Sequence, residues 1–197
     1  MRDPFSVLDQ VRDVRMIGFN TSTIAAGIAA SAEILQVRWN PTIDTSARLA
    51  IFGLEASANV ETTGFTAGQA RFNVLKASGW TADGSGGSAL TLTGNNGQLD
   101  SAEPEHDVPG VRIATTAALG AGTKSNGSIP LFSNTHVLTN AVNEVVIPRG
   151  TQLLPQAILS RRPVILNFQE GLIVTCTVPG TGTWRFAGSL IWGVIRP

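Results

Sequence analysis

The stretch LIVTCTVPGTGTWRFAGSLIWGVI, residues 172–195, decides the fold class of this sequence. Residues 172–178 carry apolar side chains at every even-numbered position, and residues 184–194 do the same except at Gly188. A period of two places these side chains on one face of a β-strand. The intervening residues 179–182, Pro-Gly-Thr-Gly, are a turn sequence. Two alternating runs joined by such a turn predict a β-hairpin.

The same alternation recurs in shorter segments of the preceding chain. It is found over residues 35–39, 47–60, 70–77, 90–93, 111–118, 143–147 and 163–168, which clusters of Gly, Asn, Ser and Pro separate. Many short strands with frequent turns are typical of an all-β sandwich. We therefore predict a single antiparallel β-sandwich or jelly-roll-like domain over residues 21–197.

The first twenty residues carry a different pattern. Phe5, Leu8 and Val11 recur at helical spacing, and Pro4 stands at a favourable first-turn position. The segment is either one short amphipathic helix or an extended arm that folds against a neighbouring subunit. We treat residues 1–20 as an arm or helix outside the sandwich.

The composition is poor in charge. Of 197 residues, 14% are charged, with 14 basic and 14 acidic side chains and a net charge of zero, whereas soluble domains average about 25% charged residues. A nucleic-acid-binding protein normally carries a basic excess, so we expect no direct contact with nucleic acid. A neutral, charge-poor surface is better tolerated when other subunits cover it. The composition therefore favours a subunit of a larger assembly.

Targeting and membrane signals are not recognisable. The opening Met1-Arg2-Asp3-Pro4 is followed by a mixed polar segment rather than by a continuous apolar run. No window approaches the roughly 18 apolar residues that span a bilayer. We expect a protein that is made in a cytoplasm and has no membrane partner.

Residue types that carry chemistry are few. The sequence has two histidines, His106 and His136, without a matching cluster, and one cysteine, Cys176, which excludes an internal disulfide and a cysteine-based zinc site. Phosphate-binding loops, nucleophile elbows, zinc-protease helices and EF-hand loops do not occur. We therefore expect no enzyme activity and no cofactor, and we interpret Cys176 as a small apolar residue of the core.

One acidic cluster stands out, made of Asp100, Glu103, Glu105, His106 and Asp107. Carboxylates this close in sequence are suitable oxygen ligands for Ca²⁺ or Mg²⁺. A solvated loop between two strands explains the same residues without a ligand, and we favour that interpretation. A metal site in this loop is the alternative.

The four tryptophans differ in their sequence surroundings. Trp39, Trp184 and Trp192 stand in alternating segments, which places them in the core or on a sheet face. Trp80 stands in the loop-like residues 78–83, so it either covers the rim of the core or is exposed as a contact for a partner. Exposed aromatic side chains also bind carbohydrate, but such sites usually draw on tyrosine, and this sequence has none.

Several turn and strand patterns resemble structural proteins of tailed bacteriophages. They are TGFTAGQ at residues 63–69, a strand ending in Lys-Ala at 76–77, a Gly/Ser loop at 84–87, LTGNNG at 92–97, RIATT at 112–116 and NFQEGLIV at 167–174. The resemblance covers residues 30–195 and implies a component of the virion. Among such components, the size and the sandwich pattern best suit a capsid cement or decoration protein. These proteins typically sit as oligomers, often trimers, on the outer capsid surface and bridge major capsid proteins.

The leading hypothesis is therefore a cement protein, made in the cytoplasm of a host bacterium and located on the outer surface of the virion. We expect its contacts with the major capsid protein from Phe5, Leu8 and Val11, with Trp80 as a weaker candidate. A tail, neck or fibre component of the virion is the first alternative. A host-surface carbohydrate-binding module is the second, and a glycan-degrading enzyme is the least favoured.

Overall fold

The computed structural model describes residues 11–25, 28, 30–92, 97–99, 107–154 and 162–196, and the regular structure among them is entirely β. The described residues form no helix that could cross a membrane. The strands are β1 (Val11–Asn20), β2 (Ile24–Ala25), β3 (Ala32–Trp39), β4 (Arg48–Val60), β5 (Gly68–Ala82), β6 (Ser88–Ala89), β7 (Gly110–Ile113), β8 (Thr123–Asn126), β9 (Phe132–Leu138), β10 (Val145–Gln152), β11 (Val164–Leu166), β12 (Glu170–Thr177) and β13 (Thr183–Ile195).

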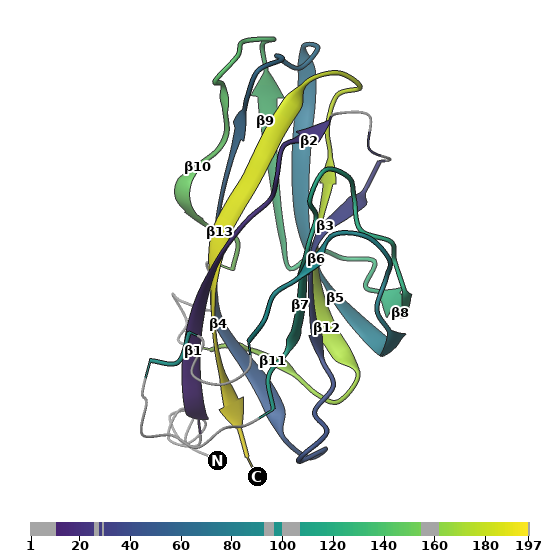
Figure 1. The fold of residues 1–197 in the computed structure, drawn as a ribbon, viewed down its shortest axis with the longest axis vertical. Helices are drawn as coiled ribbons and strands as arrows, with labels where there is room; N and C mark the ends of the chain where they lie inside the picture. Colours follow the sequence, from purple (N-terminus) through teal and green to yellow (C-terminus); the bar gives the residue numbers. More distant parts are fainter. Residues whose placement is uncertain are drawn as a thin grey trace.

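These strands form two antiparallel sheets that face each other as a sandwich (Figure 1). The first sheet has the order β1-β13-β4-β10, with β2 beside β13 and β11 beside β4. The second has the order β6-β7-β3-β12-β5-β8, with β9 also beside β5. The first and last of the described strands, β1 and β13, therefore lie side by side (Figure 1).

Eight of the described strands are paired as in a jelly roll. In chain order they are β1, β3, β4, β5, β9, β10, β12 and β13. The first pairs with the eighth and the second with the seventh, while the third pairs with the sixth and the fourth with the fifth. This nesting results when one long antiparallel ribbon is rolled into two sheets. The predicted β-sandwich of jelly-roll type is confirmed.

The core lies between the sheets and is built from alternate side chains of both. Trp184 and Phe186 of β13 are fully buried and face Phe72 of β5 in the opposite sheet. The Phe72 ring centroid lies 5.8 Å from that of Trp184, edge to face, and 6.2 Å from that of Phe186, stacked. Each such aromatic side chain contributes about 1.5–3 kcal/mol through burial. The apolar side chains at even-numbered positions of residues 172–195 thus contribute to the inner faces of both sheets.

The hairpin predicted for residues 172–195 is wrong, although both of its strands exist. β12 lies between β3 and β5, whereas β13 lies in the other sheet between β1 and β4. Residues 179–182 therefore cross from one sheet to the other. Both strands have a partner on each side, so pairing across the turn would leave backbone groups of those partners without hydrogen bonds. Alternation predicts which face of a strand is buried, but it does not predict the neighbours of the strand.

The first described segment is a strand rather than the end of a helix. β1 pairs with β13 from Val11 to Asn20, so these residues belong to the sandwich and the boundary predicted at residue 20 falls inside a sheet. The register shifts at a β-bulge where Asp13 and Arg15 form a buried ion pair, with 2.9 Å between Asp13 Oδ2 and Arg15 Nε. A bulge changes which residues face the core, which hides the period of two. The first half of the arm predicted for residues 1–20, residues 1–10, lies outside the described residues.

Cys176 lies in the core, as the sequence predicts. Burial raises the pKa of its thiol to about 12, and the thiolate is the reactive form. We expect no reaction of the native protein with a thiol reagent such as DTNB at neutral pH, and labelling of the one thiol per chain after denaturation. Rapid labelling of the native protein would contradict the buried position of Cys176.

Candidate functional site

The structure describes two of the four predicted contact residues. Phe5 and Leu8 lie outside the described residues. Val11 is the first residue of β1, pairs with Ile195 and is partly buried. Val11 directly follows the undescribed residues 1–10, and its contact with a partner stays a prediction.

Trp80 is not in a loop, and that prediction is wrong. It lies within β5 and is completely buried on the face of the sheet opposite the main core, where it packs with Ala77 and Ile173. Gly79 has a positive φ of 60°, which interrupts the alternation of side chains along β5. The sequence around Trp80 therefore resembles a loop. A side chain without exposed surface cannot act as an exposed anchor, so Trp80 stabilises the sheet in this structure.

The cover over Trp80 is a polar cluster on the same outer face. The Lys124 ammonium lies 4.5 Å from the centre of the Trp80 ring and 2.9 Å from Glu33 Oε2. Gln36 Nε2 donates to Glu33 Oε2 at 2.6 Å, and Asn126 Nδ2 donates to Glu33 Oε1 at 3.2 Å. Since the ion pair is desolvated, its partners depend on each other strongly. The cluster ties β8 to the sheet.

Only Asp107 of the acidic cluster falls within the described residues, and it organises a turn. Its carboxylate accepts the backbone N–H groups of Thr42 at 2.7 Å, Ile43 at 3.0 Å and Asp44 at 3.1 Å. Burial alone would raise the pKa of Asp107, but these hydrogen bonds outweigh it and hold the pKa below its ordinary value. Among the described residues, no group of three or more His, Cys, Asp or Glu side chains is placed to hold a metal ion.

Asp107→Asn is expected to lower the free energy of unfolding by about 1 kcal/mol at neutral pH, because hydrogen bonds to a charged acceptor are stronger than those to an amide and the site is partly exposed. The depressed pKa means that the wild-type advantage is complete above the unfolded pKa of about 4 and is lost as the pH falls through the folded value. Urea unfolding across this pH range measures both effects. An equal difference between the two proteins at acid and neutral pH would contradict this role of the carboxylate.

Exposed apolar side chains gather beside β1. Leu99 N donates to Val14 O at 2.9 Å and Met16 N donates to Gly97 O at 2.7 Å, so residues 97–99 run along the edge of β1. Met16 pairs with Ile191 of β13, whose neighbours Leu190 and Trp192 are buried in the core. Leu99 is 62% exposed and Met16 is 43% exposed. We call Val14, Met16, Leu99 and Ile191 the outer strip.

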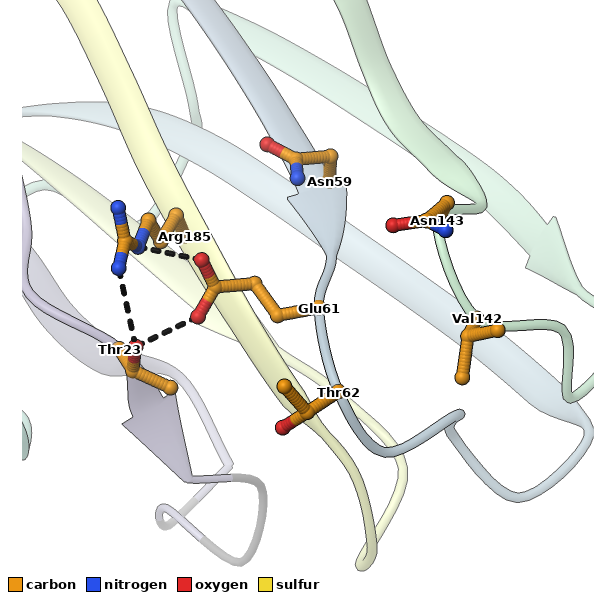
Figure 2. A pocket seen from close by; sticks show the side chains of 7 residues that line it. All are labelled: Thr23, Asn59, Glu61, Thr62, Val142, Asn143 and Arg185. Carbon is orange, nitrogen blue, oxygen red and sulfur yellow. Dashed lines mark hydrogen bonds and ion pairs between the residues drawn. The ribbon is translucent and has the colours of Figure 1, made fainter.

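A pocket opens near one end of the first sheet, with a volume of about 570 Å³ (Figure 2). Its walls come from segments far apart in the sequence, because residues before β2, at the end of β4, after β9 and at the start of β13 meet there. The lining residues are Thr23, Asn59, Glu61, Thr62, Val142, Asn143 and Arg185.

An ion pair forms one side of this pocket. Arg185 Nε contacts Glu61 Oε1, and Thr23 Oγ1 donates to Glu61 Oε2 at 2.5 Å (Figure 2). The Glu61 side chain is 17% exposed and the Arg185 side chain 47% exposed. The register that places Arg185 opposite Asn59 brings the pair together. Sequence reasoning missed this site, since neither Glu61 nor Arg185 belongs to a motif.

Comparison with known proteins gives a remote structural likeness and no relative in sequence. Neither a protein-family model nor a curated protein matches the chain. Among solved structures, a mutant VP1 pentamer of Washington University polyomavirus, in unassembled form, matches with a TM-score of 0.32 and 9% sequence identity over 93% of this chain and 94% of that chain. A likeness this remote gives no basis for transferring a function, so only the chain's own residues bear on what it does.

Proposed function

We propose that the chain is a structural component of a tailed-phage virion, of the capsid cement type, bound to the major capsid protein. The observation that supports this most is the outer strip. It exposes Met16 of β1 and Leu99 of the segment that runs along β1, on a chain whose charged fraction is 14% and whose net charge is zero. Apolar side chains with few charges around them are typical of the centre of a protein interface.

The jelly roll suits this role without requiring it. Jelly rolls occur in viral capsid proteins and in lectins, and the same fold supports unrelated functions. The sequence patterns that resemble tailed-phage structural proteins, TGFTAGQ and NFQEGLIV, lie in and around β5 and β12 of the same sandwich. The proposal therefore rests on the resemblance and on the outer strip as its contact surface, and the fold is compatible with both.

The proposed mechanism is added interface between capsid subunits. A specific interface buries on the order of 1,600 Å² in total, and apolar surface contributes roughly 25 cal/mol per Å² removed from water. Repetition over a whole shell makes even a weak contact resist expansion and rupture. We propose a homo-oligomer, with a trimer as the first form to test, on the outer capsid surface.

The test is binding to capsids prepared without this protein. Wild-type protein should bind them and raise the temperature at which they release DNA. Leu99→Glu should weaken binding about tenfold or more, because burying an unpaired carboxylate is costly. Ile129→Glu is the matched control, since Ile129 is 80% exposed and lies outside the outer strip. Equal capsid binding by the two variants would show that the outer strip does not contact the capsid.

The predicted arm needs a separate variant. Deleting residues 1–10 leaves β1 intact, whereas deleting residues 1–20 would remove a strand of the sheet. Loss of capsid binding on the shorter deletion, with an unchanged melting temperature, supports Phe5 and Leu8 as contact residues. Unchanged binding would restrict the interface to the sandwich.

A tail, neck or fibre position is the second candidate function. It uses the same fold and the same apolar contacts, but with another virion protein as the partner. Binding to tails or necks and not to capsids would favour it.

A further inference from the structure

We infer that the pocket lined by Glu61 and Arg185 binds a neutral saccharide residue. This inference is independent of the proposed function, since it uses a different surface from the outer strip. The connections β1–β3, β4–β5 and β9–β10 and the start of β13 meet at the pocket. Connections held by a rigid sandwich are the usual place for a ligand site.

Hydrogen bonds between these connections hold the walls in place. Val60 N donates to Glu144 O at 2.9 Å, which joins β4 to the β9–β10 connection. Thr183 N donates to Thr63 O at 2.9 Å, which joins β13 to the β4–β5 connection. The pocket is thus formed before a ligand arrives, so little ordering free energy is lost on binding.

The charges in the pocket favour a neutral ligand. The Arg185 guanidinium and the Glu61 carboxylate already neutralise each other. An anion attracted to Arg185 meets the Glu61 carboxylate beside it, and a cation attracted to Glu61 meets Arg185. Neither gains much Coulomb energy, because the two terms oppose each other at similar distance.

The remaining polar groups match hydroxyls. The Asn143 amide has no hydrogen-bond partner among the described residues, and Asn59 Nδ2 reaches only Val60 O, at 3.4 Å. Figure 2 shows Asn143 and Val142 on one side of Glu61, with Thr23 and Arg185 on the other. An amide can both donate and accept hydrogen bonds, and so can a sugar hydroxyl.

The volume and the lining of the pocket favour a polar ligand among the neutral ones. The volume of about 570 Å³ lies within the range of roughly 300–1,000 Å³ for small-molecule pockets. Among the described residues that line it, none is aromatic and Val142 alone is apolar. A flat aromatic or an aliphatic ligand therefore finds too little apolar surface, whereas a polyhydroxylated ring finds donors and acceptors on both sides.

Asn143 offers a clean variant. Its φ is 60°, a left-handed conformation that glycine adopts without strain, so Asn143→Gly removes the amide and keeps the backbone. Asn140 has a φ of 86° in the same connection and does not line the pocket, which makes Asn140→Gly the matched control.

The experiment is ligand-observed NMR on the full chain with neutral hexoses, neutral N-acetylhexosamines and their oligosaccharides. Glucuronic acid and glucosamine serve as charged counterparts. We expect at least one neutral sugar to bind with a millimolar dissociation constant, more tightly than its charged counterparts. Asn143→Gly should weaken it about tenfold, the effect of losing one or two hydrogen bonds, and Asn140→Gly should not. Tighter binding of the oligosaccharide than of the free sugar would identify a glycan chain as the source of the ligand.

Three results would overturn the inference. They are the absence of any neutral-sugar signal at millimolar concentration, tighter binding of a charged counterpart, and equal affinities of Asn143→Gly and Asn140→Gly. None of these results bears on capsid binding, which is measured with the outer-strip variants.

Discussion

Glu33→Ala is expected to lower the free energy of unfolding by about 4 kcal/mol, because it leaves the Lys124 ammonium buried without its counter-ion. The side chains of Lys124 and Glu33 are 1% and 7% exposed. Lys124 also donates to Ala121 O and lies over the Trp80 ring, so it cannot reach water without disturbing β8. For a chain of this length the loss corresponds to a melting temperature about 10 °C lower.

A double-mutant cycle separates the ion pair from simple loss of packing. Glu33→Leu and Lys124→Met replace both charges with apolar side chains of similar volume. The double variant should be more stable than either single variant, since neither charge is left alone. Gln36 Nε2 keeps a second acceptor, Gly120 O at 2.8 Å, so its amide is not orphaned. If the Glu33→Leu loss were the same with and without Lys124→Met, the two side chains would be energetically independent and the pair would be refuted.

Gly188→Ala is expected to lower the free energy of unfolding by about 3 kcal/mol or more, at the upper end of overpacking effects. A Cβ at Gly188 would lie 2.0 Å from Glu55 O and 2.8 Å from Phe19 Cζ. The backbone oxygen belongs to β4, the central partner of β13, and cannot move without breaking that pairing. Thermal unfolding followed by circular dichroism measures the loss.

Gly18→Ala is the matched control for Gly188→Ala. Gly18 lies in the neighbouring strand β1, and a Cβ there would meet only Gly188 O, at an ordinary 3.8 Å. We expect its melting temperature to stay within a few degrees of the wild type, since alanine reduces the entropy of the unfolded chain. Equal destabilisation by both variants would show that the effect comes from glycine in a strand in general, and not from the contact with β4.

Sequence periodicity predicted the strands better than their arrangement. Residues 47–60 and 183–195 became β4 and β13 almost unchanged, because both have long alternating or apolar runs. The hairpin at residues 172–195 failed because sheet membership depends on distant partners. β1 was hidden by the bulge at Asp13, and β9 carries too few apolar residues to show a period.

The candidate sites were harder to predict from the sequence than the strands. Glu61 and Arg185 carry no motif, and only the register of β13 against β4 brings them together. The sequence predicts a loop at Trp80 because Gly79 breaks the alternation, whereas backbone pairing with β8 continues β5 to Ala82. Exposure of Met16 depends on which residues follow the bulge in β1. In each case the decisive information is a long-range pairing, which local residue types do not encode.

The central claim, a cement protein of the virion, is tested most directly by counting copies of the chain in purified particles by quantitative mass spectrometry, with localisation by electron microscopy. A cement role predicts hundreds of copies per particle and matching density on the outer face of the capsid shell. Absence from purified particles, or a few tens of copies confined to the tail or neck, would contradict it.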